Sequence, residues 1–182
     1  TTEIYDFLRL LFARAGTAYS YNTGEKMVRY TDSKIIDLIL EKYDKRKTLI
    51  LAPVVRNRKG HYKELFEQIM RKGFLHVRID GKLTEIRHGL RLDRYKNHSI
   101  EIVIDKLQVR PDDRKRLQDS VVTAMHHGKG IIMTQDRDSD EVRYFSRQLM
   151  CPDTGISYDE PAPHSFSFNS PKGACNHCNG LG

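Results

Sequence analysis

The spacing of apolar residues along the chain predicts both helices and strands. Residues 4–11 place apolar side chains at i, i+3, i+4 and i+7, which is the stripe of an amphipathic helix. Similar stripes recur further along, with Thr31 or Asp32 as a cap for the second and Pro111 as the first residue of the fourth. Four helices are therefore predicted, over residues 1–16, 31–43, 62–73 and 111–128.

Strands are predicted where apolar residues run continuously or alternate with polar ones. Lys47–Val55 is a continuous apolar run, typical of a buried strand. Asp80-Gly81 is a strong turn signal between two short alternating segments and predicts a hairpin. Further strands, and a hairpin-like stretch at the start, are expected over residues 19–30, 75–79, 82–86, 98–109, 131–133 and 142–150. Because no regular βαβ period appears, the predicted fold class is α+β, with a mixed sheet, packed helices and a short irregular C-terminal segment.

Composition narrows the function classes. The 182 residues are 38% hydrophobic and 30% charged, and no apolar run approaches the roughly 20 residues that span a bilayer. No signal region opens the chain, and three cysteines without a paired framework favour a reducing compartment. We therefore expect a cytoplasmic protein without membrane contact. The net charge of +7 favours an acidic partner, either nucleic acid or an acidic protein surface.

A basic stretch lies between the first buried strand and the following helix. Arg56, Arg58 and Lys59 precede His61 and Lys63 there, in what the pattern predicts to be a loop. Arg78 lies on the outer face of a strand whose neighbours Val77 and Ile79 point inward. These cations can grip phosphates, meet the carboxylates of a partner protein, or form a merely solvated loop. We assign Arg56, Arg58, Lys59 and Arg78 as the candidate partner-binding residues.

The cysteines suggest a zinc module with one ligand replaced. Cys151 and Thr154 precede Cys175 and Cys178 with the spacing C-x2-T-x20-C-x2-C. Two CxxC knuckles would complete a tetrahedral site, but a threonine hydroxyl is a poor zinc ligand. Either His164 supplies the fourth ligand, or the segment is a degenerate site held by packing and hydrogen bonds.

Other catalytic and nucleotide-binding signatures are missing from the sequence. The segments TGEKM and HGKGI contain glycine and lysine but not the spacing of a P-loop, and neither G-x-S-x-G nor H-E-x-x-H occurs. The acidic residues between Asp136 and Glu141 read as an exposed turn, without the register of an EF-hand. We expect no catalysis from this chain.

Several blocks of the sequence resemble the A subunit of the bacterial UvrABC excinuclease, the UvrA family. The blocks are TTEIYDFLRLLFARAG, LAPVVRNRKGHYKELFE, RIDG, HSIEIVIDKLQVR and SFSFNSPKGACNHCNGLG, and they cover the chain nearly end to end. The resemblance implies a piece of a dimeric ABC-type ATPase that detects DNA lesions in nucleotide excision repair and loads UvrB. The Walker A lysine would then precede Thr1, and the ABC signature would follow Gly182.

The resemblance also implies a division of the chain. Residues 1–46 and 150–182 would belong to the first ATP-binding domain, and residues 47–149 would form the UvrB-binding domain. The family's zinc cysteines fall on Cys151, Cys175 and Cys178, with Thr154 in place of the fourth. ATP and the homodimer contacts would belong to the longer protein. We therefore expect a non-catalytic domain that recruits UvrB through its basic face, with DNA binding by the same cations as the alternative.

Overall fold

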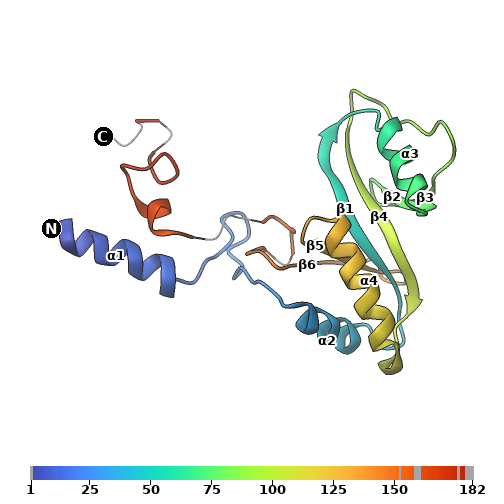
Figure 1. Cartoon of the computed structure of the whole chain (residues 1–182), viewed down its shortest axis with the longest axis horizontal. Coiled ribbons are helices and arrows are strands. Elements are labelled where there is room, and N and C mark those ends of the chain that lie inside the picture. Colours follow the sequence, from blue (N-terminus) through green and yellow to red (C-terminus); the bar gives the residue numbers. More distant parts are fainter. Residues whose placement is uncertain (1, 152, 158–160, 176, 179–182) are drawn as a thin grey trace.

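The computed structural model describes residues 2–151, 153–157, 161–175, 177 and 178. Its centre is a single six-stranded sheet with the order β3-β2-β4-β1-β5-β6 (Figure 1). The strands are β1 (Lys47–Lys59), β2 (His76–Ile79), β3 (Lys82–Glu85), β4 (Asn97–Gln108), β5 (Ile131–Asp136) and β6 (Val142–Ser146). The helices are α1 (Thr2–Ala15), α2 (Asp32–Lys42), α3 (Lys63–Arg71) and α4 (Arg114–His127), with short 3-10 turns η1 (Pro111–Asp113) and η2 (Pro163–Phe166).

The predicted α+β class is confirmed, but the prediction of a mixed sheet was wrong. Every pairing between the strands named above is antiparallel. The β2–β3 hairpin shows why local turns favour this arrangement. Asp80 and Gly81 have φ values of 49° and 87°, and positive φ at both central residues is what a type I′ hairpin turn requires.

The two long strands β1 and β4 form the spine of the sheet. They pair from Lys47 opposite Gln108 to Lys59 opposite Asn97, with three register shifts along β1. On its other side, β1 pairs with β5 only over Thr48–Leu51. Beyond Leu51, the described part of β1 therefore has a strand partner on one side only. Pro53, which cannot donate to a sheet ladder, lies in this half of β1.

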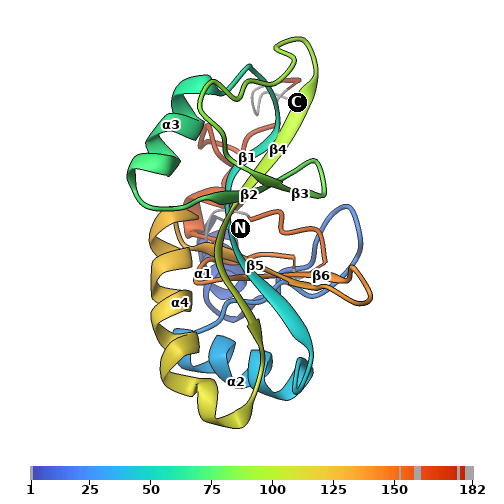
Figure 2. The same cartoon turned by 90° about the vertical axis from the view of Figure 1, so that its right-hand side faces the viewer.

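Three helices cover one face of the sheet and bury its core. Figure 2 shows α3 and α4 on the same side of the β1–β4 spine. Ile35 and Ile39 of α2 and Leu117 of α4 are fully buried in the same cluster as Ile50 and Ile100 of the sheet. Thr31 caps the start of helix α2, because its Oγ1 accepts a hydrogen bond from the Lys34 N–H at 3.3 Å. Helix α2 thus belongs to the core of the sheet, although it lies before the predicted domain boundary at residues 46 and 47. The domain boundaries themselves stay a prediction.

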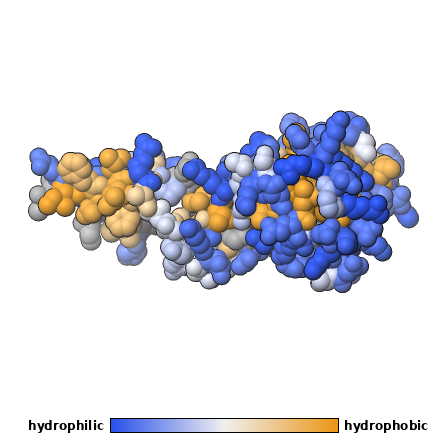
Figure 3. Space-filling model, turned by 90° about the horizontal axis from the view of Figure 1, so that it is seen from below, coloured by the Kyte–Doolittle hydropathy of each residue, from blue (hydrophilic) through white to orange (hydrophobic). Residues whose placement is uncertain are grey.

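Helix α1 lies apart from the sheet and forms an arm with η2 (Figure 1). The Tyr5 hydroxyl donates to the Phe166 carbonyl at 2.8 Å and accepts from the Phe168 N–H at 3.2 Å. The apolar stripe predicted for this helix exists but is exposed, with Ile4 at 66% and Phe7 at 72% (Figure 3). None of the described helices is both long and apolar enough to cross a membrane.

Candidate partner-binding surface

The predicted basic loop is in fact the end of a strand. β1 continues to Lys59, because Arg58 pairs with His98 and Lys59 with Asn97 on β4. A bulge at the positive-φ residue Asn57 interrupts the alternation. The strand therefore holds the cations on a rigid scaffold, and the four predicted residues occupy different environments.

Arg56 is half-buried against the C-terminal part of the chain. Its Nη1 donates to the Gly155 carbonyl at 2.6 Å, and its guanidinium lies 5.5 Å from the centroid of the Tyr144 ring. Burial lowers the pKa of Arg56, opposed by its attraction to Tyr144 and Glu101. Its Nη2 is buried without a hydrogen-bond partner among the described residues.

Arg78 forms a buried ion pair on the face of the sheet away from the helices. Its Nη1 lies 3.1 Å from Glu101 Oε2, and the two side chains are only 15% and 4% exposed. Burial raises the pKa of Glu101, and the neighbouring Arg78 counteracts part of that rise. Arg78 Nε is also buried without a partner among the described residues. Arg56 and Arg78 both lower the pKa of Glu101, while the carboxylate of Asp80 acts to raise it.

An open pocket of about 440 Å³ extends from Arg56 along the half of β1 that β5 leaves unpaired. Arg56 and Arg58 line it from the strand, and Lys129 lines it from the turn after α4. None of the described residues that line the pocket is acidic. Tyr62 forms part of the wall, and its hydroxyl donates to the Arg58 carbonyl at 2.8 Å. Three cations around one opening suit a carboxylate or phosphate group.

Lys129 is a residue that the sequence analysis missed. It lies between Gly128 and Gly130 with φ of 53°, in the turn that joins α4 to β5. In the sequence, Gly128-Lys129-Gly130 lacks the spacing of a P-loop, and no other local pattern marks Lys129 as a binding residue. Lys59, by contrast, is exposed at the far end of β1 and is not among the residues that line the pocket.

The acidic side chains of the turn over residues 136–141 form hydrogen bonds and ion pairs with other residues of this chain. Asp136 Oδ1 accepts from the Asp138 N–H at 2.9 Å, and Asp136 Oδ2 pairs with Arg46 at 2.9 Å. Glu141 pairs with Lys42. Backbone hydrogen bonds from Asp138, together with Arg46, hold the pKa of Asp136 below its usual range.

The cysteines were predicted to form a zinc set with Thr154 in the fourth place. Cys151 is buried, and its Sγ lies 3.4 Å from Thr23 Oγ1. Burial alone would raise the pKa of the Cys151 thiol, but hydrogen bonds from Thr154 and Thr23 lower it to about 7.

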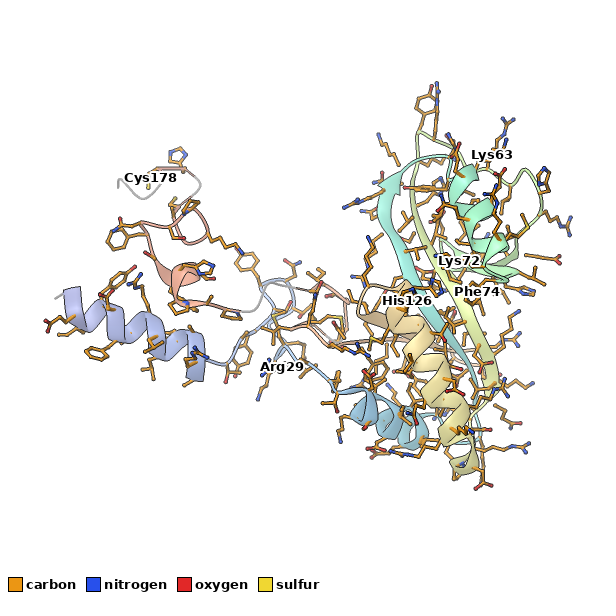
Figure 4. All side chains as sticks on the ribbon, viewed as in Figure 1. Arg29, Lys63, Lys72, Phe74, His126 and Cys178 are labelled. Carbon is orange, nitrogen blue, oxygen red and sulfur yellow. The ribbon has the colours of Figure 1, made fainter. Side chains whose placement is uncertain are left out.

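The other two cysteines are separate from this contact. Cys175 is exposed, and Figure 4 shows Cys178 at the end of the molecule that carries α1. Within the described ranges, no group of three or more histidine, cysteine or acidic side chains is placed to hold a metal ion. Zinc binding by these cysteines therefore stays a prediction.

Comparison with known proteins identifies the relatives of this chain. A family model described as the UvrA interaction domain matches residues 31–138. Over its whole length, the chain is 45% identical to UvrABC system protein A of Methanothermobacter thermautotrophicus, 43% to that of Bacillus subtilis and 40% to that of Thermus thermophilus. It spans 19% of the length of each of these relatives. Since the family model covers more than half of the sequence, the chain belongs to the UvrA interaction domain family.

Proposed function

We propose that this chain is a non-catalytic interaction module that recruits UvrB to damaged DNA during nucleotide excision repair. The family is described as an interaction domain, and the relatives carry the name of a UvrABC system protein. UvrB is the partner we assign within that system. ATP hydrolysis, homodimer contacts and a cytoplasmic location are proposed for the longer protein of which this domain is part.

The observation that carries this proposal is the pocket beside the half of β1 that β5 leaves unpaired. It gathers Arg56, Arg58 and Lys129 around one opening, without an acidic residue among its described lining. A carboxylate from UvrB would complement these cations, because it supplies negative charge and hydrogen-bond acceptors together.

Roles within the surface differ with burial. Arg58 and Lys129 are exposed and therefore free to contact a partner directly. Arg78 is buried in its ion pair with Glu101, so we assign it no direct contact with the partner. Replacing Arg78 would leave a buried carboxylate uncompensated, which makes it a poor probe of binding.

The test is to titrate fluorescently labelled UvrB with the wild-type chain and two charge-reversal variants. Lys129→Glu and Arg58→Glu each place a carboxylate where the partner's carboxylate should sit. We expect each to weaken binding by roughly 2 kcal/mol, which is about 30-fold in Kd. Raising the salt concentration should weaken wild-type binding more than binding by either variant.

Lys115→Glu is the matched control. Lys115 is exposed near the start of α4, at the opposite end of that helix from Lys129. The charge change is identical, so a loss caused only by lower net charge would appear in this control as well. Wild-type affinity in both pocket variants would refute the proposed surface.

A further inference from the structure

A second basic surface lies on the loop between β3 and β4, and the proposed UvrB contact does not use it. Residues 87–96 read RHGLRLDRYK, which holds four cations against one carboxylate. Arg87, Arg91, Arg94 and Lys96 are all exposed. We call residues 87–96 the tip loop.

The few ion pairs of the tip loop leave its charge available. Arg87 lies 3.8 Å from Glu85 with 83% of its side chain exposed, and Lys96 lies 3.9 Å from Asp93 with 75% exposed. Exposed pairs at such distances contribute little and are readily exchanged for another anion. No ion pair is found for Arg91 or Arg94 within the part of the chain that the structure describes.

The tip loop is anchored even though it has no regular structure. Leu90 and Leu92 pack against the main core, and the Leu92 N–H donates to the His61 carbonyl at 2.9 Å. His98 Nε2 lies 2.9 Å from the Asp93 carbonyl, while its Nδ1 lies 2.6 Å from Asp80 Oδ2. Because the backbone is already held, binding by its cations costs less conformational entropy than ordering a free loop would.

Neighbouring cations extend the same surface. Lys59 is the last residue of β1 and His61 follows it, and the His61 carbonyl accepts the hydrogen bond from the Leu92 N–H of the tip loop. Lys63 lies at the start of α3 near the same end of the molecule (Figure 4). All three residues are exposed. The positive surface is therefore broader than the loop alone.

The chemistry of the tip loop suits a phosphate backbone. Its two leucines pack against the core, so its exposed part is dominated by four cations against one carboxylate. Three of its four cations are arginines, which match phosphate oxygens with a planar fork of donors. Tyr95 is 69% exposed beneath the Arg94 guanidinium, which lies 4.6 Å from its ring centroid.

We propose that the tip loop binds the phosphate backbone of duplex DNA, at a surface distinct from the pocket that holds Lys129. Binding of this kind is driven by the release of counterions, so its affinity falls steeply with salt and depends little on base sequence. One domain would then contact DNA through its tip and the protein partner through the half of β1 that β5 leaves unpaired. The inference stands on the loop itself and does not require the UvrB proposal to hold.

The experiment measures binding of a labelled 30-base-pair duplex by fluorescence anisotropy across a salt series. The test variant combines Arg87→Gln, Arg91→Gln and Arg94→Gln. Losing three phosphate contacts should reduce the slope of log affinity against log salt by about 2.7. Between about 50 and 200 mM salt, the wild type should then lose about 40-fold more affinity than the variant.

A charge-matched control separates the tip loop from net charge. Lys34→Gln, Lys45→Gln and Lys115→Gln together remove three exposed cations from α2, the turn before β1 and α4. This control should keep the wild-type slope. If the triple tip variant fails to fold, Arg91→Gln alone should still lower the slope by about 0.9.

Two results would overturn the inference. One is a wild-type slope in the tip variant, and the other is an equal loss of slope in the control. UvrB titration keeps the two proposals apart, since the tip variant should retain UvrB affinity while Lys129→Glu should retain the DNA slope. A tip variant that loses UvrB and keeps DNA would identify the tip as a protein contact and refute the DNA assignment.

Discussion

The six-stranded sheet with helices α2, α3 and α4, here called the sheet unit, and the α1 arm both contain amphipathic helices. The apolar stripe is buried in the sheet unit and exposed in the arm. In the sheet unit, the apolar stripes of α2 and α4 are covered, and Ile39 and Leu117 are fully buried. In the arm, α1 packs mainly against η2 among the described residues, and Leu8 stays 45% exposed and Phe7 72% exposed. A 3.6-residue apolar period therefore predicts a helix in both places, but it does not tell whether a partner covers the stripe.

The two regions also expose different kinds of surface. The arm presents apolar side chains from a helix, whereas the sheet unit presents cations from a strand and a loop that are themselves anchored. The charged surfaces of the sheet unit are the ones for which we propose partners. The following predictions test the contrast between the two regions.

The largest expected effect comes from shortening one leucine in each region. Leu117→Ala in α4 removes a fully buried side chain and should lower the free energy of unfolding by about 3 kcal/mol. Leu8→Ala in α1 makes the same chemical change at a half-exposed position and should cost less than about 1 kcal/mol. Urea unfolding followed by circular dichroism measures both. Equal losses would show that α1 is buried as deeply as the sheet helices.

A smaller effect concerns the pH dependence of the sheet unit. The hydrogen bond to Asp80 raises the pKa of His98, and the Asp93 carbonyl faces its other ring nitrogen, so the folded state favours the doubly protonated ring. The resulting stabilisation is complete below the unfolded value of 6.5 and is lost as the pH rises through the folded pKa. Between pH 6 and pH 8, the wild type should therefore lose about 1 kcal/mol of stability more than His98→Gln.

The same pair of side chains fixes the lower limit of that pH window. Burial acts to raise the pKa of Asp80, but hydrogen bonds from His98 and the Ser99 N–H lower it below 3.8. The contribution of Asp80 is thus present above that value and is lost only as the pH falls through its folded pKa. Unfolding measured at four or five pH values in wild type and His98→Gln checks the window. Parallel curves between pH 6 and pH 8 would contradict the charged state of His98.

Much of the fold could be predicted from local patterns, and the failures have a common cause. The four helices, the hairpin at Asp80-Gly81 and the long central strands match the predicted segments closely, because periodicity and turn chemistry act over a few residues. The predicted hairpin over residues 19–30 is reduced to a single bridge between Tyr19 and Lys26. The extension of β1 to Lys59 was missed because it depends on pairing with His98 and Asn97, which lie about 40 residues further along the chain.

The site was harder to predict than the fold. Arg56 and Arg58 were found from their charge alone, but their shared pocket depends on where β5 stops pairing with β1. Lys129 joins them from a turn more than 70 residues away in sequence, which no local pattern reveals. Alternation places Arg78 and Glu101 on the face away from the helices, yet only the three-dimensional structure shows that this ion pair is buried.

The central claim is that the sheet unit, not the arm, docks UvrB. Hydrogen–deuterium exchange of the chain with and without UvrB tests it most directly, because both candidate regions report in one experiment. We predict that UvrB protects backbone amides of residues 54–58 and 128–131 and leaves those of α1 unchanged. Protection confined to α1, with unchanged exchange around the pocket, would contradict the account.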